Sequence, residues 1–578
     1  MNSRIVLFII LILATFLRVY KLDERGPFTD EKFTLLNANG FWVGAANQEE
    51  ITSKTYFTPA DFWTSKGIND YFEAIAHSDF GTHIIYNGVI HVWMTVFGNS
   101  DFAIRLLSVL FNLLMLFVVY RLVKRVFKSE VPALISVFLL ALEPLNIAQS
   151  HIARSYTLSF LLVILATDIF LRLLDFRTKR KTLLFFLYAA LIGASLLNHY
   201  LNFLVPLSHA IVFLFARKDK KLWTGFISAG VFSCVLMWWW FTSGGGHLSM
   251  SFLKDKNEKH LAMAQMKDNP LGSAIQLSSP EVVIKKTISL FLDSNTLTNG
   301  IYQNFNGVKN MLISLFFALV LGFSFIFYEK NKKQVAFSFM FLAFSLLVYF
   351  NTLAFSFLIT SVFYYALYFG FKYVIKNLNF KEPVIKTSLV FVCLLMLFLP
   401  IFFVIYDAFK NGHTTSLTHR YIGVASPFVA ILIAFGLSEL LVANKRAFVF
   451  ISIVFLLQIP NLVRVIGDFY KDRSNNYAFF VPERIKNPYK RIAENLEKVY
   501  AKGDTVLIPS FNGDVYSTTF GLKNTVTYTD AQYLNLYLPK DSKIIERVDP
   551  SEPNKFFIKK ENGDKVLLAD LEGLKFRY

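Results

Sequence analysis

Residues 101–121 read DFAIRLLSVLFNLLMLFVVYR, and residues 122–128 continue as LVKRVFK. Between its two ends the first stretch carries one charged side chain, Arg105, and it is otherwise almost continuously apolar. A helix of about 20 such residues crosses the hydrocarbon core of a bilayer, which is roughly 30 Å thick. The basic residues that follow are typical of the cytoplasmic end of a membrane-spanning helix. This stretch therefore predicts a transmembrane helix.

Apolar runs of similar length recur along the whole chain. The 578 residues are 54% hydrophobic and only 17% charged, and 63 of them are Phe. A soluble protein of this length would need more charge on its surface. We therefore predict an integral membrane protein with about thirteen spans. The predicted spans are residues 4–19, 101–121, 132–149, 155–174, 182–198, 201–216, 222–241, 310–328, 334–350, 353–371, 387–406, 421–441 and 447–463.

The net charge of +18 is distributed according to topology. Basic clusters lie at alternate ends of the apolar runs, which is the positive-inside pattern of cytoplasmic loops. This placement argues against a nucleic-acid partner and predicts a cytoplasmic N-terminus and an extracytoplasmic C-terminus. The clusters occupy residues 121–128, 172–181, 217–221, 330–333, 372–386 and 445–446.

Three long segments are predicted on the outer side. In the first, residues 21–100, two aromatic stretches at 71–76 and 84–97 are typical of interfacial helices. The second, residues 242–309, opens with the sequence SGGG, which indicates a flexible hinge and a mobile loop or lid. The third begins at residue 464 and predicts a small α/β domain. Its expected elements are a helix at 489–501 and strands at 505–509, 525–529, 543–548, 555–558 and 565–568.

An acidic pair follows the first predicted span. Asp30 and Glu31 belong to the sequence RGPFTDEK at residues 25–32. Paired carboxylates at a membrane face can supply a general base together with a metal ligand or hydrogen-bond partner. The same residues can instead open a helix, with Thr29 or Asp30 as its cap and acidic side chains in its first turn. The spacing alone leaves both interpretations open.

Several cations are predicted at the same face. Arg154 lies in a tight outer loop, Arg420 opens the twelfth span, and Arg105 is near the outer end of the second. A guanidinium group matches phosphate oxygens, but an interfacial arginine can also simply extend its head group to water. His199 and Tyr200, between the fifth and sixth spans, are equally ambiguous. Together, an acidic pair and several cations at one face suit an enzyme that acts on a lipid phosphate.

The order of these motifs resembles the GT-C membrane glycosyltransferases of the glycosyltransferase family 39 type. That broad family contains the protein O-mannosyltransferases and the lipid A aminoarabinose transferase. The similarity extends over most of the chain. The matching motifs are Arg18 through Asp30-Glu31; Trp93 with FGNS at 97–100, FA at 102–103 and RLLS at 105–108; Pro144, Gln149 and RSY at 154–156; His199-Tyr200; HRY at 419–421 with Pro427; and residues 490–509.

This resemblance implies a polyprenyl-phosphate sugar as donor and a glycan, lipid A or protein as acceptor, with inversion at the transferred sugar. Asp30 would take the proton of the acceptor, and Glu31 would orient Asp30 or help to hold a divalent cation such as Mg²⁺ or Mn²⁺. The implied substrate-binding residues are Arg154, Tyr156, Arg420, Arg105, His83, His199 and Tyr200. Arg154 and Arg420 would be the main ligands of the leaving phosphate.

The resulting expectation is an all-α polytopic GT-C domain with a small C-terminal extracytoplasmic α/β domain. The membrane domain would comprise residues 1–463 with outer loops at 21–100 and 242–309, and the α/β domain residues 464–578. We expect a hexosyl- or pentosyltransferase of the bacterial plasma (inner) membrane, surrounded by membrane lipids.

Three other interpretations stay open at this stage. The first is a transporter, or a flippase for lipid-linked glycans, without transferase activity. Transporters usually place ionisable residues near the bilayer midplane, whereas these spans are mostly uncharged apart from exceptions such as Asp168. The second is a polysaccharide polymerase or ligase that uses similar lipid substrates. The third is an inactive homologue that serves as an assembly subunit.

Overall fold

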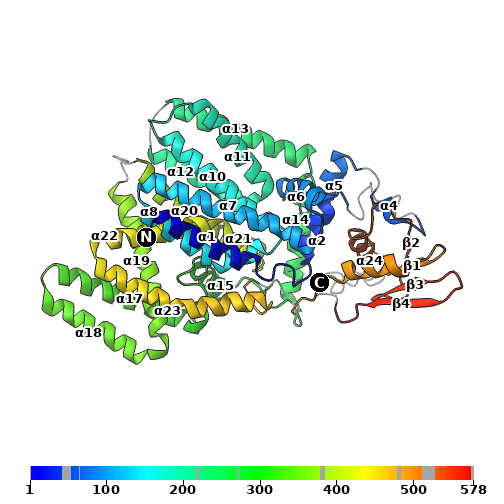
Figure 1. Cartoon of the computed structure of the whole chain (residues 1–578). Helices are drawn as coiled ribbons and strands as arrows, with labels where there is room; N and C mark the ends of the chain where they lie inside the picture. Colours follow the sequence, from blue (N-terminus) through cyan, green and yellow to red (C-terminus); the bar gives the residue numbers. More distant parts are fainter. Residues whose placement is uncertain are drawn as a thin grey trace.

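The computed structural model describes residues 2–574 except 42–53, 64–65, 217–219, 270, 273, 378–383, 475, 478–482 and 511–527. The described chain is mainly helical, with one small sheet near its C-terminus (Figure 1). Every span predicted from the sequence falls on a helix. Within the described residues, nine helices are long and apolar enough to cross a membrane. They are α7 (Asp101–Phe127), α10 (Tyr156–Leu174), α11 (Lys181–Asn198), α13 (Lys220–Ser243), α17 (Val308–Glu329), α19 (Ala354–Lys376), α20 (Val384–Asn411), α22 (Ser426–Ala443) and α23 (Lys445–Tyr470).

The other four predicted spans are bent or short. Helices α8 (Glu130–Leu142) and α9 (Pro144–Ser150) meet at an angle of 61° and would together form one broken span. The break has a local cause, because Pro144 forces the preceding residue, Glu143, into an extended conformation. The remaining three are α1 (Ser3–Val19), α12 (Leu204–Ala216) with the 3₁₀ turn before it, and α18 (Lys333–Tyr349). The count of about thirteen spans therefore stays a prediction.

At the basic ends of the helices, lysine and arginine side chains pair with acidic side chains. Lys386, near the start of α20, forms an ion pair of 3.0 Å with Glu439 of α22. Asp168 of α10 pairs with Arg125 of α7 and with Arg172, each at 2.7 Å. These contacts explain Asp168, which looked like an isolated charge in the sequence: it neutralises two basic anchors at the predicted cytoplasmic end.

Most of the labelled helices of the two predicted outer loops lie at the opposite end (Figure 1). The first loop contributes α2 (Thr29–Ala38), α4 (Pro59–Phe62), α5 (Ile68–Ser78) and α6 (Ile84–Phe97), and the second contributes α14 (Ser249–Gln265), α15 (Pro280–Leu292) and α16 (Tyr302–Phe305). The short helix α21 (His419–Ile422) precedes α22 at this end. The two stretches predicted to be interfacial are thus helical, within α5 and α6.

The glycine run at 244–246 packs around Trp240. A Cβ on Gly244, Gly245 or Gly246 would lie 2.4, 2.8 and 2.7 Å, respectively, from atoms of that indole ring. Trp240 is fully buried, and its Nε1–H donates to the carbonyl of Gly81 at 2.9 Å. The sequence suggested a flexible hinge here, but the absence of side chains lets the backbone approach the ring closely.

The C-terminal unit contains α24 (Pro488–Val499), α26 (Thr529–Asn535) and a four-stranded sheet of order β2-β1-β3-β4. The strands are β1 (Thr505–Pro509), β2 (Ile545–Asp549), β3 (Lys555–Lys559) and β4 (Lys565–Asp570). Strand β1 is parallel to β2 and antiparallel to β3, and β3 is antiparallel to β4. Four of the five predicted strands are therefore found. The fifth, 525–529, lies mostly outside the described residues, and helix α26 begins at Thr529.

The C-terminal unit shares one apolar core with the first outer loop. Leu35 of α2 and Phe57 and Phe62 of the same loop belong to one buried cluster with Tyr489 and Leu534 of the C-terminal unit. Phe57 also forms an isolated β-bridge with Glu546 of strand β2. The unit therefore packs directly against the segment that carries the acidic pair.

Candidate active site

Helix α2 begins at the acidic pair because Glu31 caps it. The Glu31 carboxylate accepts the backbone N–H of Phe28 at 2.7 Å, satisfying one of the donors that a helix start leaves open. It also accepts the N–H of Ala153 at 2.8 Å, and it is fully buried. The helix start that the sequence offered as an alternative is therefore found, with acidic side chains in its first turn, but its N-cap is Phe28 and not Thr29 or Asp30, and the capping side chain is Glu31.

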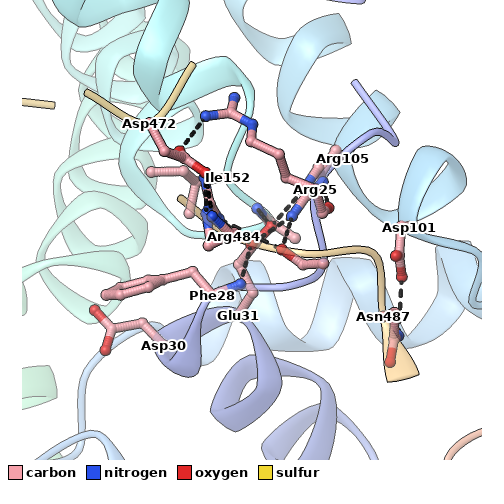
Figure 2. A network of polar contacts seen from close by, with 12 residues as sticks. Arg25, Phe28, Asp30, Glu31, Asp101, Arg105, Ile152, Asp472, Arg484 and Asn487 are labelled. Carbon is pink, nitrogen blue, oxygen red and sulfur yellow. Dashed lines mark hydrogen bonds and ion pairs between the residues drawn. The ribbon is translucent and has the colours of Figure 1, made fainter. Parts of the chain in front are cut away.

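Arg105 is the main partner of Glu31. Its Nε and Nη2 atoms each lie 2.9 Å from a carboxylate oxygen of Glu31 (Figure 2). The other three N–H groups donate to the carbonyls of Leu22, Arg25 and Gly26. All five donors of this guanidinium are therefore engaged within the protein. We accordingly assign it no phosphate contact, although the sequence suggested one.

The positive charges of Arg105 and Arg484 keep Glu31 ionised. Burial alone would raise the pKa of Glu31, but the charges of Arg105 and Arg484 outweigh it, and the pKa is lowered. Arg484 approaches a Glu31 oxygen to 3.9 Å. Glu31 is therefore an ionised carboxylate that ties α2 to α7.

Asp30 points elsewhere. In Figure 2 its carboxylate is directed away from the network around Glu31. Its side chain is 29% exposed, and its Oδ2 atom lies 3.3 Å from Nη1 of Arg420. Its backbone carbonyl accepts a hydrogen bond from Nη1 of Arg154 at 3.1 Å. The structure thus brings together three residues that the sequence predicted at one face: Asp30, Arg154 and Arg420.

Arg154 is already paired with a carboxylate that the sequence did not single out. Its Nη1 lies 2.9 Å from one oxygen of Asp79, and its Nη2 lies 3.1 Å from the other. Both side chains are buried, and Asp79 also accepts from Asn37 at 2.9 Å. Burial raises the pKa of Asp79, with Arg154 opposing the rise. Most of the Arg154 charge is therefore offset within the protein.

His83 is neutral, and its hydrogen bonds define its tautomer. Nε2 accepts from Nη2 of Arg154 at 2.9 Å, so the ring proton is on Nδ1. Nδ1 faces the hydroxyl of Ser155 and, at 3.2 Å, the carbonyl of Asn198. Burial, reinforced by the Arg154 charge, holds the pKa of His83 well below its usual value. His83 therefore orients Arg154 as a hydrogen-bond acceptor.

The other predicted residues surround His83. The ring of His199 lies 5.6 Å from that of His83 and 5.8 Å from that of Tyr156. Burial lowers the pKa of His199 to about 4. Tyr200 has a different function in the fold: its hydroxyl donates to the carbonyl of Gly81 at 2.8 Å. It thereby holds the turn that leads into α6.

Arg420 is positioned by its neighbour in the sequence. His419 Nε2 lies 2.9 Å from Oδ2 of Asp293, and Asn476 donates to the same oxygen at 2.9 Å. Asp293 belongs to the second outer loop and accepts the N–H of Gly300 at 2.8 Å. This loop, which the sequence suggested as a lid, therefore includes a buried part that fixes α21.

A further cation near this site is Lys256 of α14. Its Nζ lies 4.7 Å from the ring centre of Phe80, the residue after Asp79. Burial lowers the pKa of His260 to about 3, and the charges of Lys256 and Arg420 act in the same direction. Sequence reasoning missed Lys256 because it is one of several lysines in a polar helix. Asp79 could have been noticed as the one acidic residue between the two aromatic stretches.

The acidic pair does not fit a divalent metal as a pair of ligands. The oxygens of Glu31 are taken by two backbone N–H groups and by Arg105. Across the described parts of the chain, no group of three or more His, Cys, Asp or Glu side chains could hold a metal ion.

Comparisons with known proteins bear on this arrangement. Residues 84–240 match the model of a family described as dolichyl-phosphate-mannose-protein mannosyltransferase. No curated protein matches the chain. A solved oligosaccharyltransferase of Archaeoglobus fulgidus, tethered with an acceptor peptide, is 13% identical with a TM-score of 0.43, over 94% of this chain and 60% of that one. ArnT from Cupriavidus metallidurans, bound to undecaprenyl phosphate, is 12% identical with a TM-score of 0.37, over 92% of this chain and 85% of that one.

The chain thus spans about 60% of the length of the archaeal oligosaccharyltransferase. The family match runs from α6 into α13 and includes Arg105 and Arg154, while Asp30 and Arg420 lie outside it. Because at least nine helices in the described residues are long and apolar enough to cross a membrane, the protein is a polytopic membrane protein with a small C-terminal sheet, and its residues 84–240 are similar to the dolichyl-phosphate-mannose-protein mannosyltransferase family.

Proposed function

We propose that this protein transfers a sugar from a polyprenyl-phosphate donor to a glycan, lipid or protein acceptor at the outer face of a bacterial plasma membrane. Asp30 is the general base, and the sugar inverts. The observation that carries the proposal is the 3.3 Å contact between the partly exposed Asp30 carboxylate and Arg420. It puts an acid and a cation that are 390 residues apart in the chain at one place.

The reaction needs a base and a charge sink. As the acceptor oxygen or nitrogen forms its bond to the anomeric carbon, its proton passes to Asp30. The bond between that carbon and the phosphate oxygen breaks, and its electron pair leaves with the phosphate. Negative charge on the leaving phosphate increases along this path, so a fixed cation beside it lowers the barrier.

Arg420 is the cation best placed for that role. Asp79 offsets the charge of Arg154, which instead holds the backbone of Asp30 and so positions the base. Lys256 lies near the same site from the second outer loop. The phosphate would therefore contact Arg420 first and Lys256 second. The rings of His199 and Tyr156 pack beside His83 at the same site.

The proposed reaction uses no divalent cation, because the carboxylate of Glu31 is bound to Arg105. A metal requirement, which the sequence left open, is tested by chelation. Full activity in excess EDTA is expected. Loss that Mg²⁺ or Mn²⁺ restores would assign Asp30 to a metal instead.

The direct experiment uses purified protein or membranes with radiolabelled polyprenyl-phosphate sugars. Label should move to an extractable acceptor, and Asp30→Asn should reduce transfer by roughly 10²–10⁴-fold. Asp23→Asn is the matched control, since it changes an exposed carboxylate of the same segment. Near-normal turnover by Asp30→Asn would overturn the base assignment. Label that crosses the bilayer without leaving the lipid would indicate a flippase.

A further inference from the structure

Helix α2 presents three consecutive side chains to three different parts of the protein. Asp30 contacts Arg420 of α21, and Glu31 contacts Arg105 of α7. Lys32 points to the C-terminal unit, where its Nζ lies 5.3 Å from the ring centre of Tyr489. The first turn of α2 is therefore held from the C-terminal unit as well as from the membrane domain.

The environment of Lys32 is an aromatic pair. Its Nζ is also 4.8 Å from the ring centre of Tyr533, and the two tyrosine rings meet edge to face at 5.4 Å. The Tyr489 hydroxyl donates to Asp530, whose charge also acts on Lys32. Lys32 is only 6% exposed. Burial lowers the pKa of Lys32 to about 7, with the charge of Asp530 opposing the shift. Packing of the long stem between the rings therefore acts in both protonation states, and the protonated form adds a cation–π attraction.

The segment that leads into the C-terminal unit reinforces this contact. The N–H of Gly26 donates to the carbonyl of Ile485 at 2.8 Å, so the two backbones touch just before α2. A Cβ at Gly26 would lie 2.9 Å from that oxygen, which explains the glycine. Arg25 and Arg484 both pair with Asp472 (Figure 2). The entry to α2 is thus bound to the chain that follows α23.

From this geometry we infer that the C-terminal unit positions the base Asp30, and that Lys32, enclosed by Tyr489 and Tyr533, is the residue through which it does so. The inference rests on the proposed function, in which Asp30 is the base. Lys32 is a positioning residue and contacts no substrate. Because it lies two residues from Asp30 in the same helical turn, a shift of this turn moves the carboxylate relative to Arg420.

The test compares Lys32→Ala with Lys32→Met in the full-length protein. The Ala variant empties the space between the rings, whereas Met retains most of the stem. Misplacing a catalytic group by about 1 Å can cost as much as 10²-fold, so kcat of Lys32→Ala should fall roughly ten- to hundredfold. KM for the donor should change less than about threefold, and Lys32→Met should recover most of kcat, because only the position of the base is disturbed.

The matched control is Lys540→Ala. The Nζ of Lys540 lies 4.1 Å from the ring centre of Trp63, so it also joins the C-terminal unit to the first outer loop by a lysine–aromatic contact, but away from α2. Its removal should leave kcat unchanged. Hydrogen exchange provides a readout independent of activity: the amides of α2 should exchange faster in Lys32→Ala than in wild type or Lys540→Ala.

Unchanged kcat and α2 exchange in Lys32→Ala would overturn the inference, and so would an equal loss of kcat in Lys540→Ala. A fall in kcat together with a large rise in KM for the donor, without recovery in Lys32→Met, would also overturn the inference. Wild-type protein that transfers no sugar would reject the proposed function separately. In that case the exchange of α2 still decides whether Lys32 couples this helix to the C-terminal unit.

Discussion

Oδ2 of Asp30 lies 3.3 Å from Nη1 of Arg420, although 390 residues separate them in the chain. The proposed base is therefore paired with the proposed phosphate ligand. A donor phosphate that takes Arg420 would weaken this pair and leave the Asp30 carboxylate free to accept a proton. The contact thus links donor binding to the readiness of the base.

Arg420→Ala should impair use of the donor more than use of the acceptor. Removing one group that stabilises developing charge typically costs about 10²–10³-fold. We expect a decrease of that order in kcat/KM for the lipid-linked sugar, with a much smaller change in KM for the acceptor. Arg473→Ala is the control, because that arginine is 65% exposed and pairs loosely with Glu483 at 4.0 Å. Equal effects on both substrates would argue against a phosphate contact.

The convergence of Asp30, Arg154 and Arg420 at one face could be predicted from the sequence because topology alone decides it. Alternating basic clusters assign each loop to a side, and long apolar runs locate the helices. The strands of the C-terminal unit were also predictable, since short β-rich runs alternate there with turn residues. These features are local in the sequence.

The partners of the charged residues could not be predicted in this way. Asp79 pairs with Arg154 across 75 residues, and Glu31 pairs with Arg105 across 74. Such pairs depend on how helices pack, which periodicity does not encode. For the same reason the sequence placed Asp30 and Glu31 in one site, whereas packing leaves Asp30 partly exposed and buries Glu31.

Asp79→Asn should destabilise the protein. It leaves Arg154 buried without its counter-charge, and breaking a buried pair from one side typically costs about 3–5 kcal/mol. The thermal midpoint in detergent should fall accordingly. The double variant Asp79→Leu with Arg154→Met should recover much of the stability, because it removes both charges. A midpoint for Asp79→Asn equal to wild type would show that Arg154 does not depend on this carboxylate.

Glu546 should make the C-terminal unit less stable as the pH rises. Burial raises the pKa of this carboxyl from 4.5 to about 8, with Asn535 donating to it at 2.7 Å. Between these values the folded state holds a proton that the unfolded state has lost. Its contribution is therefore complete below about pH 4.5 and is lost as the pH rises through about 8.

The matched variant for this pH effect is Glu546→Gln, which keeps the side chain neutral at every pH and preserves an acceptor for Asn535. Its thermal midpoint should equal that of wild type near pH 5 and exceed it near pH 8. Parallel pH profiles for the two proteins would show that Glu546 does not titrate in this range.

Glu31→Gln and Asp30→Asn should have opposite signatures, even though the two residues are adjacent. Glu31 is fully buried against Arg105, so its neutralisation leaves a buried cation unpaired and should lower the thermal midpoint. Asp30 is 29% exposed, so Asp30→Asn should leave the midpoint almost unchanged while it reduces transfer by roughly 10²–10⁴-fold. Measuring kcat and thermal midpoint for both variants separates the two roles. If Asp30→Asn were the destabilising change and Glu31→Gln the inactive but stable one, the base would have to be Glu31, and the buried pair with Arg105 would have to open during the reaction.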